Sequence, residues 1–505
     1  MNAASAKSQA LRRPVGRPYV SPPIVLGVAL ALAAGLIAPL ALAKSLPIVA
    51  GLTLISLLAL RLDELLTVLI VAFIVLIEFY GLLGYFNVPM SALIVLIFIG
   101  VILWGRPRWL RLVRPYAIAW IPIILLGGLR VLGSPALREA LYYYLDVIVA
   151  PLLMLLLGML VARDTGHFRR LLTLLAVFGG LLAVHSIIQS STGIFLLETQ
   201  RQSDYLSSTT GFALSGSGVS RAGSFLLNPD WNGAFLALMI FPPLGLFFSA
   251  TSWGARVFSV ITLALIAAAM LLTYTASAWV ASAFGLLVFL WLGMRGRTRW
   301  YTLGAIGVVG ATAITTLHHQ FLLLYQHATG NNEVSLRVGA WETALRVIQH
   351  YPLWGIGYGQ VNYLTRAEPY RVALQVVPLA HPHNAYLELA ALGGIPLLLL
   401  FLLVLGIAAR AAARTLRQVP PHDRPLVACV LASLAAFALV NMAINGWTLQ
   451  PLAAIAWLLL GAAASPLLTR SLSGFSGPAG LAHSARQSSG VLAPSNETVT
   501  AGVHS

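Results

Sequence analysis

The amino-acid sequence predicts an all-α protein that crosses a membrane many times. Of the 505 residues, 59% are hydrophobic and 9% are charged, whereas soluble domains carry about 25% charged residues. Apolar runs long enough to cross about 30 Å of hydrocarbon as helices recur along the chain. The two-residue alternation of membrane β-strands is missing from these runs. We therefore expect a polytopic transmembrane helix bundle of about 12–14 spans, with a partly helical extracytoplasmic loop.

The apolar runs give fourteen candidate spans. In chain order they lie near residues 24–43, 46–60, 65–83, 89–105, 116–133, 140–162, 171–190, 232–250, 256–275, 278–294, 301–317, 385–408, 425–445 and 450–468. The first run follows four basic residues and in this respect is similar to a signal peptide. No convincing small-residue cleavage site follows it, and further spans come directly after. We expect a retained first helix.

These spans divide the chain into seven regions. We predict a disordered cytoplasmic N-terminus (1–21), N-terminal transmembrane helices (22–190), an extracytoplasmic loop with an arginine motif (191–231), middle transmembrane helices (232–317), a large extracytoplasmic loop (318–384), C-terminal transmembrane helices (385–470) and a disordered cytoplasmic tail (471–505). All other connections are short. Long polar segments on one side of the membrane indicate that the function lies there.

Basic residues set the predicted orientation. The net charge is +16, from 31 Lys and Arg against 15 Asp and Glu. With a cytoplasmic N-terminus, 22 of these 31 basic residues fall on the cytoplasmic side and 9 on the other, as the positive-inside rule requires. The charge therefore indicates topology and not a nucleic-acid partner. Cys429 is the single cysteine, so no disulfide framework is expected.

Ionisable residues inside predicted spans are a second signal, because such groups are costly in lipid. Glu78, Arg130, Asp146 and His185 all fall in the outer halves of their spans. The simplest interpretation is that Arg130 and Asp146 pair with each other or extend outward to the interface. No clear charge lies at the midplane, where transporters keep their coupling sites.

The large loop is predicted to contain a short amphipathic helix. Ser335 is a suitable N-cap and Pro352 prevents continuation. One face at helical spacing contains Trp341, Ala344, Leu345 and Ile348. The apolar face of this helix is expected to meet lipid headgroups at the outer interface.

Two groups of motifs carry the candidate chemistry. The first contains Arg337-x3-Trp341, Pro352-Leu-Trp-Gly355-Ile-Gly357-Tyr-Gly359, His383-Asn384-x-Tyr-Leu-Glu388 and Gly393-Gly-Ile-Pro396, and the second contains Arg221-Ala-Gly223-Ser-Phe225 with Asn228-Pro229-Asp230. Together they resemble the signature segments of the O-antigen ligase and polymerase superfamily, and they cover about a quarter of the chain. Each piece alone is weak, whereas the combination is fairly specific.

The resemblance implies a bacterial membrane glycosyltransferase that needs neither a metal nor a cofactor. Its donor would be an undecaprenyl-diphosphate-linked glycan at the outer face of the inner membrane, and its other partners a glycan or lipid acceptor and membrane lipids, without nucleic acid. His383 matches the family's catalytic histidine. Arg221 and Arg337 are the candidate ligands of the donor diphosphate. We expect Asn384, Glu388 and Asp230 to act as supporting residues.

These residue types suit the chemistry. Arginine stays charged in a partly dry site and binds phosphate oxygens bidentately, and the near-neutral pKa of histidine suits proton removal from a hydroxyl. Each residue also has a structural alternative. Arg221 and Arg337 are also suited to binding lipid phosphates at the interface. His383 is a candidate hydrogen-bond partner of the backbone at the next helix, because either Asn384 or His383 must cap that helix.

The chain departs from the family pattern at two positions. Many members carry a Ser-Arg pair where this chain has Ala276, so a third basic contact to the donor is in doubt. Asp230 stands where asparagine is more usual, and an acidic group there is suited to pair with Arg221 and position it.

Several functions remain open from the sequence. Within the superfamily, ligases, polymerases and protein-glycosylating enzymes share these motifs. A lipid-linked oligosaccharide flippase is the main alternative from another class, and an inactive membrane scaffold is the second. Both rivals are disfavoured because Arg and His gather in two outside loops and not along the middle of the bundle.

Overall fold

The computed structural model describes residues 107–134, 136–192, 221–226, 228–316 and 333–475, with single residues at 99, 318 and 322. The first four predicted spans, Glu78, both termini and most of the 191–231 loop lie outside these residues. Within the described part of the chain every regular element is a helix, which confirms the predicted all-α class.

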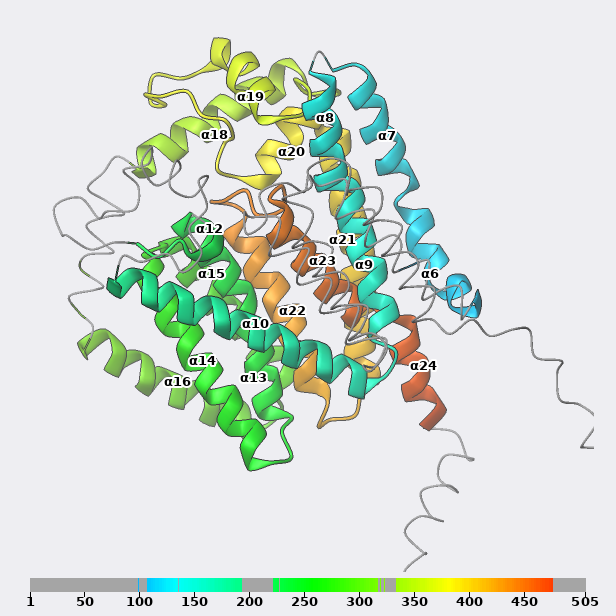
Figure 1. Ribbon diagram of the computed structural model, residues 1–505, viewed down its shortest axis with the longest axis vertical. Helices are drawn as coiled ribbons and strands as arrows, with labels where there is room; N and C mark the ends of the chain where they lie inside the picture. Colours follow the sequence, from blue (N-terminus) through cyan, green and yellow to red (C-terminus); the bar gives the residue numbers. More distant parts are fainter. Residues whose placement is uncertain are drawn as a thin grey trace, which may run out of the picture.

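The described helices follow one another along the chain in the order seen in Figure 1. The first half contains α6 (Pro107–Ala119), α7 (Ile121–Leu132), α8 (Leu137–Tyr144), the π-helical turn η3 (Leu145–Val149), α9 (Ala150–Val161), α10 (Thr165–Thr192), the short 3-10 turn η5 (Ser224–Leu226), α12 (Pro229–Met239), α13 (Phe241–Phe248), α14 (Trp253–Thr273), α15 (Ala276–Gly293) and α16 (Arg297–Thr316). The second half contains α18 (Glu333–His350), α19 (Gln360–Arg366), the 3-10 turn η6 (Glu368–Tyr370), α20 (Ala385–Gly393), α21 (Ile395–Gln418), α22 (Arg424–Val440), α23 (Gln450–Ala463) and α24 (Pro466–Phe475).

Seven helices of the described part are long and apolar enough to cross a membrane, or up to eight if the bent pair α6–α7 is one span. The pair bends by 52°, within the predicted span 116–133. Helix α22 is apolar but shorter, and α16 is not among the seven although a span was predicted at 301–317. The chain is therefore a multi-pass membrane protein.

The predicted span 385–408 is divided in the structure. Helix α20 ends at Gly393, and α21 starts at Ile395 after Gly394, whose φ is 84°. A side chain at position 394 would collide with the main chain at Leu353. Glycine is thus required at this break, both for its positive φ and because the main chain at Leu353 leaves no room for a side chain. Helix α20 is not among the helices long enough to span the membrane.

The bundle has two chemically different ends, which α22 connects. At the start of α22, Asp423 accepts a 3.1 Å hydrogen bond from Arg169, and Arg424 donates to the main-chain oxygen of Leu292. We call this the basic end. At the other end, roughly 25 Å away for a 17-residue helix, α18, α19 and α20 lie together at the top of Figure 1.

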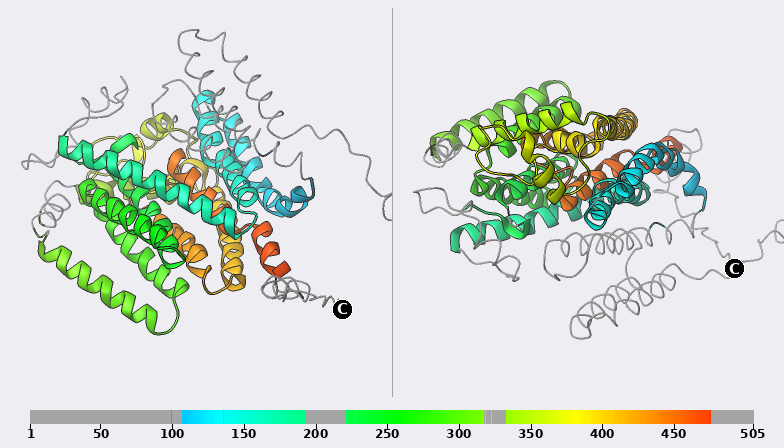
Figure 2. Two further views of the ribbon diagram at one scale, coloured as in Figure 1. Left: turned by 60° about the horizontal axis from the view of Figure 1, so that its bottom comes forward. Right: turned by 90° about the horizontal axis from the view of Figure 1, so that it is seen from above.

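Close packing of small residues holds the centre of the bundle. Helices α9 and α23 cross where Gly158 and Gly461 each lie directly against the main chain of the opposite helix, which is typical of membrane helix pairs. Helix α10 packs along α12, α13 and α14 in all three views (Figures 1 and 2). Because α10 is fixed in this way, its last turns lie beside the segment that begins at Arg221.

Candidate active site

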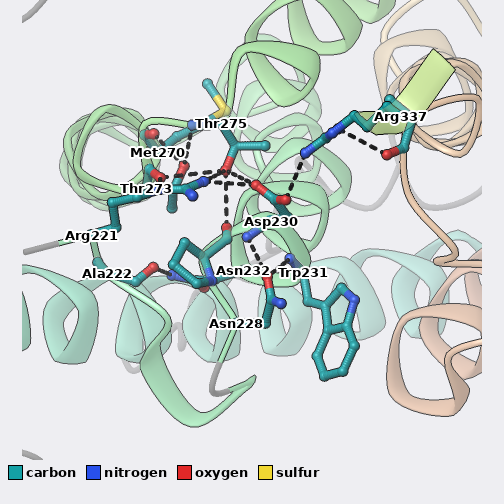
Figure 3. Close-up of polar contacts among 12 residues, drawn as sticks. Arg221, Ala222, Asn228, Asp230, Trp231, Asn232, Met270, Thr273, Thr275 and Arg337 are labelled. Atoms are coloured by element: carbon teal, nitrogen blue, oxygen red, sulfur yellow. Dashed lines mark hydrogen bonds and ion pairs between the residues drawn. The ribbon is translucent and has the colours of Figure 1, made fainter. Parts of the chain in front are cut away.

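Two arginines and one aspartate that are far apart in the sequence meet in a single ion-pair cluster (Figure 3). Arg221 Nη2 donates to Asp230 Oδ1 at 2.7 Å, and Arg337 Nη2 donates to Asp230 Oδ2 at 2.8 Å. Their side chains are 7%, 16% and 17% exposed for Arg221, Asp230 and Arg337. The cluster therefore carries a net charge of +1 in a largely dry environment, which favours an anionic ligand.

The position of Asp230 follows from the start of α12. Asn228 caps this helix, because its side chain accepts from the main-chain N–H groups of Asp230 and Trp231. Pro229 occupies the first helical position, where its missing N–H costs nothing. An acidic residue in the first turn is stabilised by the helix dipole, so the local sequence places the carboxylate without help from the arginines.

Arg221 is held by the turn between α14 and α15. Its Nε donates to the main-chain oxygen of Thr273 at 2.9 Å, and the next residue, Ala222, donates from its main chain to Leu272. Tyr274 adopts a left-handed conformation at φ 50° and closes α14. Thr275 Oγ1 lies 3.1 Å from Asp230 Oδ1. Arg221 is thus locked in place through both its backbone and its guanidinium.

The departure from the family at Ala276 lies at the edge of this cluster. Ala276 is exposed in the first turn of α15, directly after Thr275. Arg221 and Arg337 are the arginines that form ion pairs with Asp230 among the described contacts.

Arg337 belongs to the amphipathic helix predicted in the large loop. That helix, α18, begins at Glu333, so Ser335 lies inside its first turn. Ala344 is buried against the protein, whereas Leu345 is 48% exposed. The face that packs on the protein follows Ala340, Ala344 and Val347, and the contact of the predicted apolar face with lipid headgroups stays a prediction.

His383 lies directly before α20 at the same end of the bundle. Asn384 is the N-cap of α20, since its side chain accepts from the N–H groups of Tyr386 and Leu387. The structure thus decides between the two predicted caps in favour of Asn384. His383 interacts electrostatically with Asp230, so the structure brings Arg221, Asp230, Arg337, His383 and Asn384 to one region. Their roles in catalysis stay predictions.

A polar loop that the sequence reading overlooked connects these groups. Residues 441–449 join α22 to α23. The main-chain oxygen of Ala443 accepts from Arg337 at 3.0 Å, and that of Met442 accepts from Asn384 at 3.0 Å. Asn445 Oδ1 accepts from Trp231, the neighbour of Asp230. The signal in the sequence was Asn441 and Asn445, two amides at the end of the predicted span 425–445.

A second overlooked group is the polar stripe at the end of α10. Gln189 Oε1 accepts from the main-chain N–H of Ser224 at 2.6 Å, and His185 Nδ1 lies 2.9 Å from Ser224 Oγ. Ser186 Oγ accepts from Asn232, which also donates to Ala222. All are buried. These contacts hold Ser224, which has a φ of 51° and lies three residues after Arg221. His185, which the sequence marked as an ionisable residue inside a span, therefore helps to position the segment that contains Arg221.

Glu388 lies one turn into α20 and is 3% exposed. Its carboxyl accepts from Thr448 Oγ1 at 2.9 Å and from the Tyr143 hydroxyl at 3.4 Å. Burial raises the pKa of Glu388 from 4.5 to about 8, although the Thr448 and Tyr143 hydrogen bonds oppose the rise. With this raised pKa, Glu388 is mostly protonated and uncharged at neutral pH. Because its hydrogen-bond partners lie on α8 and the 441–449 loop, the side chain connects these two elements to α20.

The suggested pair of Arg130 with Asp146 does not form. Arg130 donates instead to the main-chain oxygen of Gly355 at 3.4 Å, and Asp146 Oδ1 is buried without a hydrogen-bond partner. The reason is that Gly355 starts the glycine-rich turn, which lies over α7. Within the described residues no group of His, Cys, Asp and Glu is placed to hold a metal ion.

Comparison with protein families matches residues 261–402 to the O-antigen ligase family. This region is similar to O-antigen ligase domains. It contains Arg337, His383, Asn384 and Glu388, and it confirms the resemblance to the O-antigen ligase and polymerase superfamily. No curated protein matches the chain. Together with the spanning helices, the match supports a membrane enzyme of the ligase or polymerase type.

Proposed function

We propose that this O-antigen ligase-like enzyme transfers a glycan from undecaprenyl diphosphate to an acceptor hydroxyl at the outer face of a bacterial inner membrane. The observation that carries the proposal is the Arg221–Asp230–Arg337 cluster beside His383. A diphosphate is the anion that two convergent guanidinium groups suit best. The cluster lies at the opposite end of α22 from the basic end, and the positive-inside rule favours the outer face for it.

The reaction divides among the residues as follows. His383 takes the proton of the acceptor hydroxyl, and the acceptor oxygen attacks the anomeric carbon of the donor. The bond between that carbon and the phosphate oxygen breaks, and its electron pair leaves with the diphosphate. Arg221 and Arg337 stabilise the negative charge that grows on the leaving oxygen. The new glycosidic bond forms without a nucleotide sugar.

Asp230 serves this reaction by preorganisation. Because its two carboxylate oxygens each hold one arginine, both guanidinium groups are in place before the donor arrives. Charges that need no rearrangement during the reaction stabilise the transition state most effectively. Asp230 also offsets one of the two positive charges, which lowers the cost of keeping the arginines buried without a ligand.

The test is glycan transfer by the purified protein in lipid nanodiscs, with a synthetic undecaprenyl-diphosphate oligosaccharide as donor. Arg221→Ala, Arg337→Ala and His383→Ala are each expected to reduce kcat/KM by about 100-fold or more. Arg346→Ala is the matched control, since Arg346 lies on the same helix as Arg337 but is exposed and pairs only with Glu342 in the described contacts. Full activity of the three site variants would refute the assignment.

Products distinguish the remaining alternatives. In a deletion strain complemented with His383→Ala, accumulation of single repeat units indicates a polymerase, and accumulation of long lipid-linked chains indicates a ligase. Transfer to a protein acceptor indicates the third branch. A flippase would instead move a fluorescent lipid-linked glycan across vesicles without forming a glycosidic bond.

A further inference from the structure

Two histidines, and not one, lie beside the arginine–aspartate cluster. His381 and His383 are both half-buried and flank Pro382 directly before α20. Their ring centroids are 4.4 Å apart, and the rings are inclined at 62°. Arg337 and His383 are the charged neighbours that act on His381. The sequence motif contains His383 alone, so position in the motif gave no reason to choose His381.

A hydrogen bond fixes the tautomer of His381. The main-chain N–H of His383 donates to His381 Nδ1 at 3.3 Å, so Nδ1 must carry a lone pair. A neutral imidazole with an accepting Nδ1 holds its proton on Nε2 and is therefore a hydrogen-bond donor there. Burial, with the nearby His383 and Arg337, also keeps the pKa of His381 well below 6.5, so the ring stays neutral at pH 7.

The same hydrogen bond supports an uncommon backbone conformation. His383 has φ 52°, in the left-handed region that costs free energy for any residue with a Cβ atom. Such residues persist where their surroundings determine the conformation, and they gather at active sites. Here His381 holds the N–H of His383 from one side, and the Asn384 cap of α20 holds the chain from the other.

We propose that His381 is a second functional residue of the site, which positions His383 through Nδ1 and supplies a hydrogen-bond donor at Nε2 for a substrate oxygen. This rests on the proposed function, in which His383 removes the acceptor proton. The two histidines then have different roles in the reaction. His383 exchanges a proton, whereas His381 keeps its proton and stabilises charge, because their environments differ.

Three substitutions separate the two roles in the nanodisc transfer assay. His381→Ala removes both hydrogen bonds and is expected to lower kcat about 100-fold with KM for the donor within about threefold. His381→Asn keeps an acceptor near Nδ1, and His381→Gln keeps a donor near Nε2, so each is expected to recover at least about tenfold of kcat relative to alanine. His350→Ala, an exposed histidine of α18, is the control and is expected to match the parent protein.

Two activity results overturn the proposal. One is a His381→Ala variant that retains more than about a third of the parent kcat. The other is equal impairment of the alanine, asparagine and glutamine variants in proteins that remain folded by gel filtration, since a merely structural position gives no recovery. If His381→Ala fails to fold, the asparagine and glutamine variants are compared with the parent protein, and a kcat within about a third of the parent value in both would overturn the proposal.

A measurement without turnover keeps this test separate from the proposed function. In ¹⁵N-histidine-labelled protein, the His381 signals, assigned by their loss in His381→Gln, are expected to show the neutral Nε2–H tautomer from pH 6 to pH 8. An Nδ1–H or imidazolium pattern refutes the role of His381 even if the enzyme is active. Absence of transfer by the parent protein together with the expected tautomer refutes the proposed function only.

Discussion

Replacing Glu388 by glutamine is expected to remove a pH dependence from the stability of the fold. The carboxyl is buried, has two hydroxyl donors and has no cation among its described hydrogen-bond and ion-pair partners. Glutamine keeps the shape and the neutral state of the protonated acid. The variant should therefore be as stable as the parent protein at low pH and should differ from it progressively as the pH rises.

The magnitude follows from the shift in pKa. Burial raises the pKa of Glu388 from 4.5 to about 8 in the folded protein, and each pH unit of difference corresponds to about 1.36 kcal/mol. Because the unfolded chain releases the proton first as the pH rises, the free energy of unfolding falls between pH 4.5 and pH 8. The expected fall is about 2.5 kcal/mol from pH 5 to pH 7 and about 5 kcal/mol in total, with no further change above about pH 9.

The assay is equilibrium unfolding of the detergent-solubilised protein, followed by tryptophan fluorescence from pH 5 to pH 9. Subtracting the curve of Glu388→Gln from that of the parent isolates the contribution of this one carboxyl. Glu342→Gln is the control, because Glu342 is 50% exposed and forms only a surface pair with Arg346 among the described contacts. Parallel curves for the parent and Glu388→Gln would refute the reasoning.

Three further substitutions test the cluster, the bundle and the α10 stripe. Asp230→Asn leaves the buried Arg221 and the partly buried Arg337 without their shared carboxylate, so the free energy of unfolding should fall by about 3–5 kcal/mol; an unchanged unfolding midpoint would contradict this. Gly461→Ala pushes a methyl group into the main chain of α9, whereas the added methyl group of Gly406→Ala enters open space. In the same unfolding assay, only Gly461→Ala should lower the free energy of unfolding, by about 1–3 kcal/mol, which is the usual cost of overpacking. Gln189→Ala removes the acceptor of a buried main-chain N–H, which costs about 1–3 kcal/mol, and hydrogen exchange should rise in residues 221–226; unaltered exchange there would argue against the positioning role.

The sequence alone predicted the fold class, which the structure confirms, and named the residues of the candidate site, because both predictions use local properties of the chain. Hydropathy is a sum over neighbouring residues, so the spans at 140–162, 171–190, 232–250 and 256–275 correspond to spanning helices within a few residues. Motif residues such as Arg337 and His383 were chosen by their resemblance to one family, and the family match contains both. Nothing in this reading required knowledge of which helices touch.

Tertiary structure decided what depends on contacts. Asp230 and Arg337 are 107 residues apart in the chain, and no periodic pattern indicates that one carboxylate holds two arginines. The 441–449 loop was passed over because it is short, yet its main-chain oxygens hold Arg337 and Asn384. Every residue has a main-chain acceptor, so the sequence does not indicate which carbonyl oxygen will bind a given side chain.

Two findings that the sequence did not predict have the same physical cause: Arg130 does not pair with Asp146, and His381 hydrogen-bonds to the backbone of His383. A partly buried cation pairs with whichever acceptor packing brings near, which for Arg130 is the oxygen of Gly355 and not the carboxylate of Asp146. A histidine's tautomer is fixed by its hydrogen-bond partner, which for His381 is a main-chain N–H two residues along the chain. The sequence determined that this protein is a membrane helix bundle with arginines and histidines in its long loops, whereas only packing determined which of them meet.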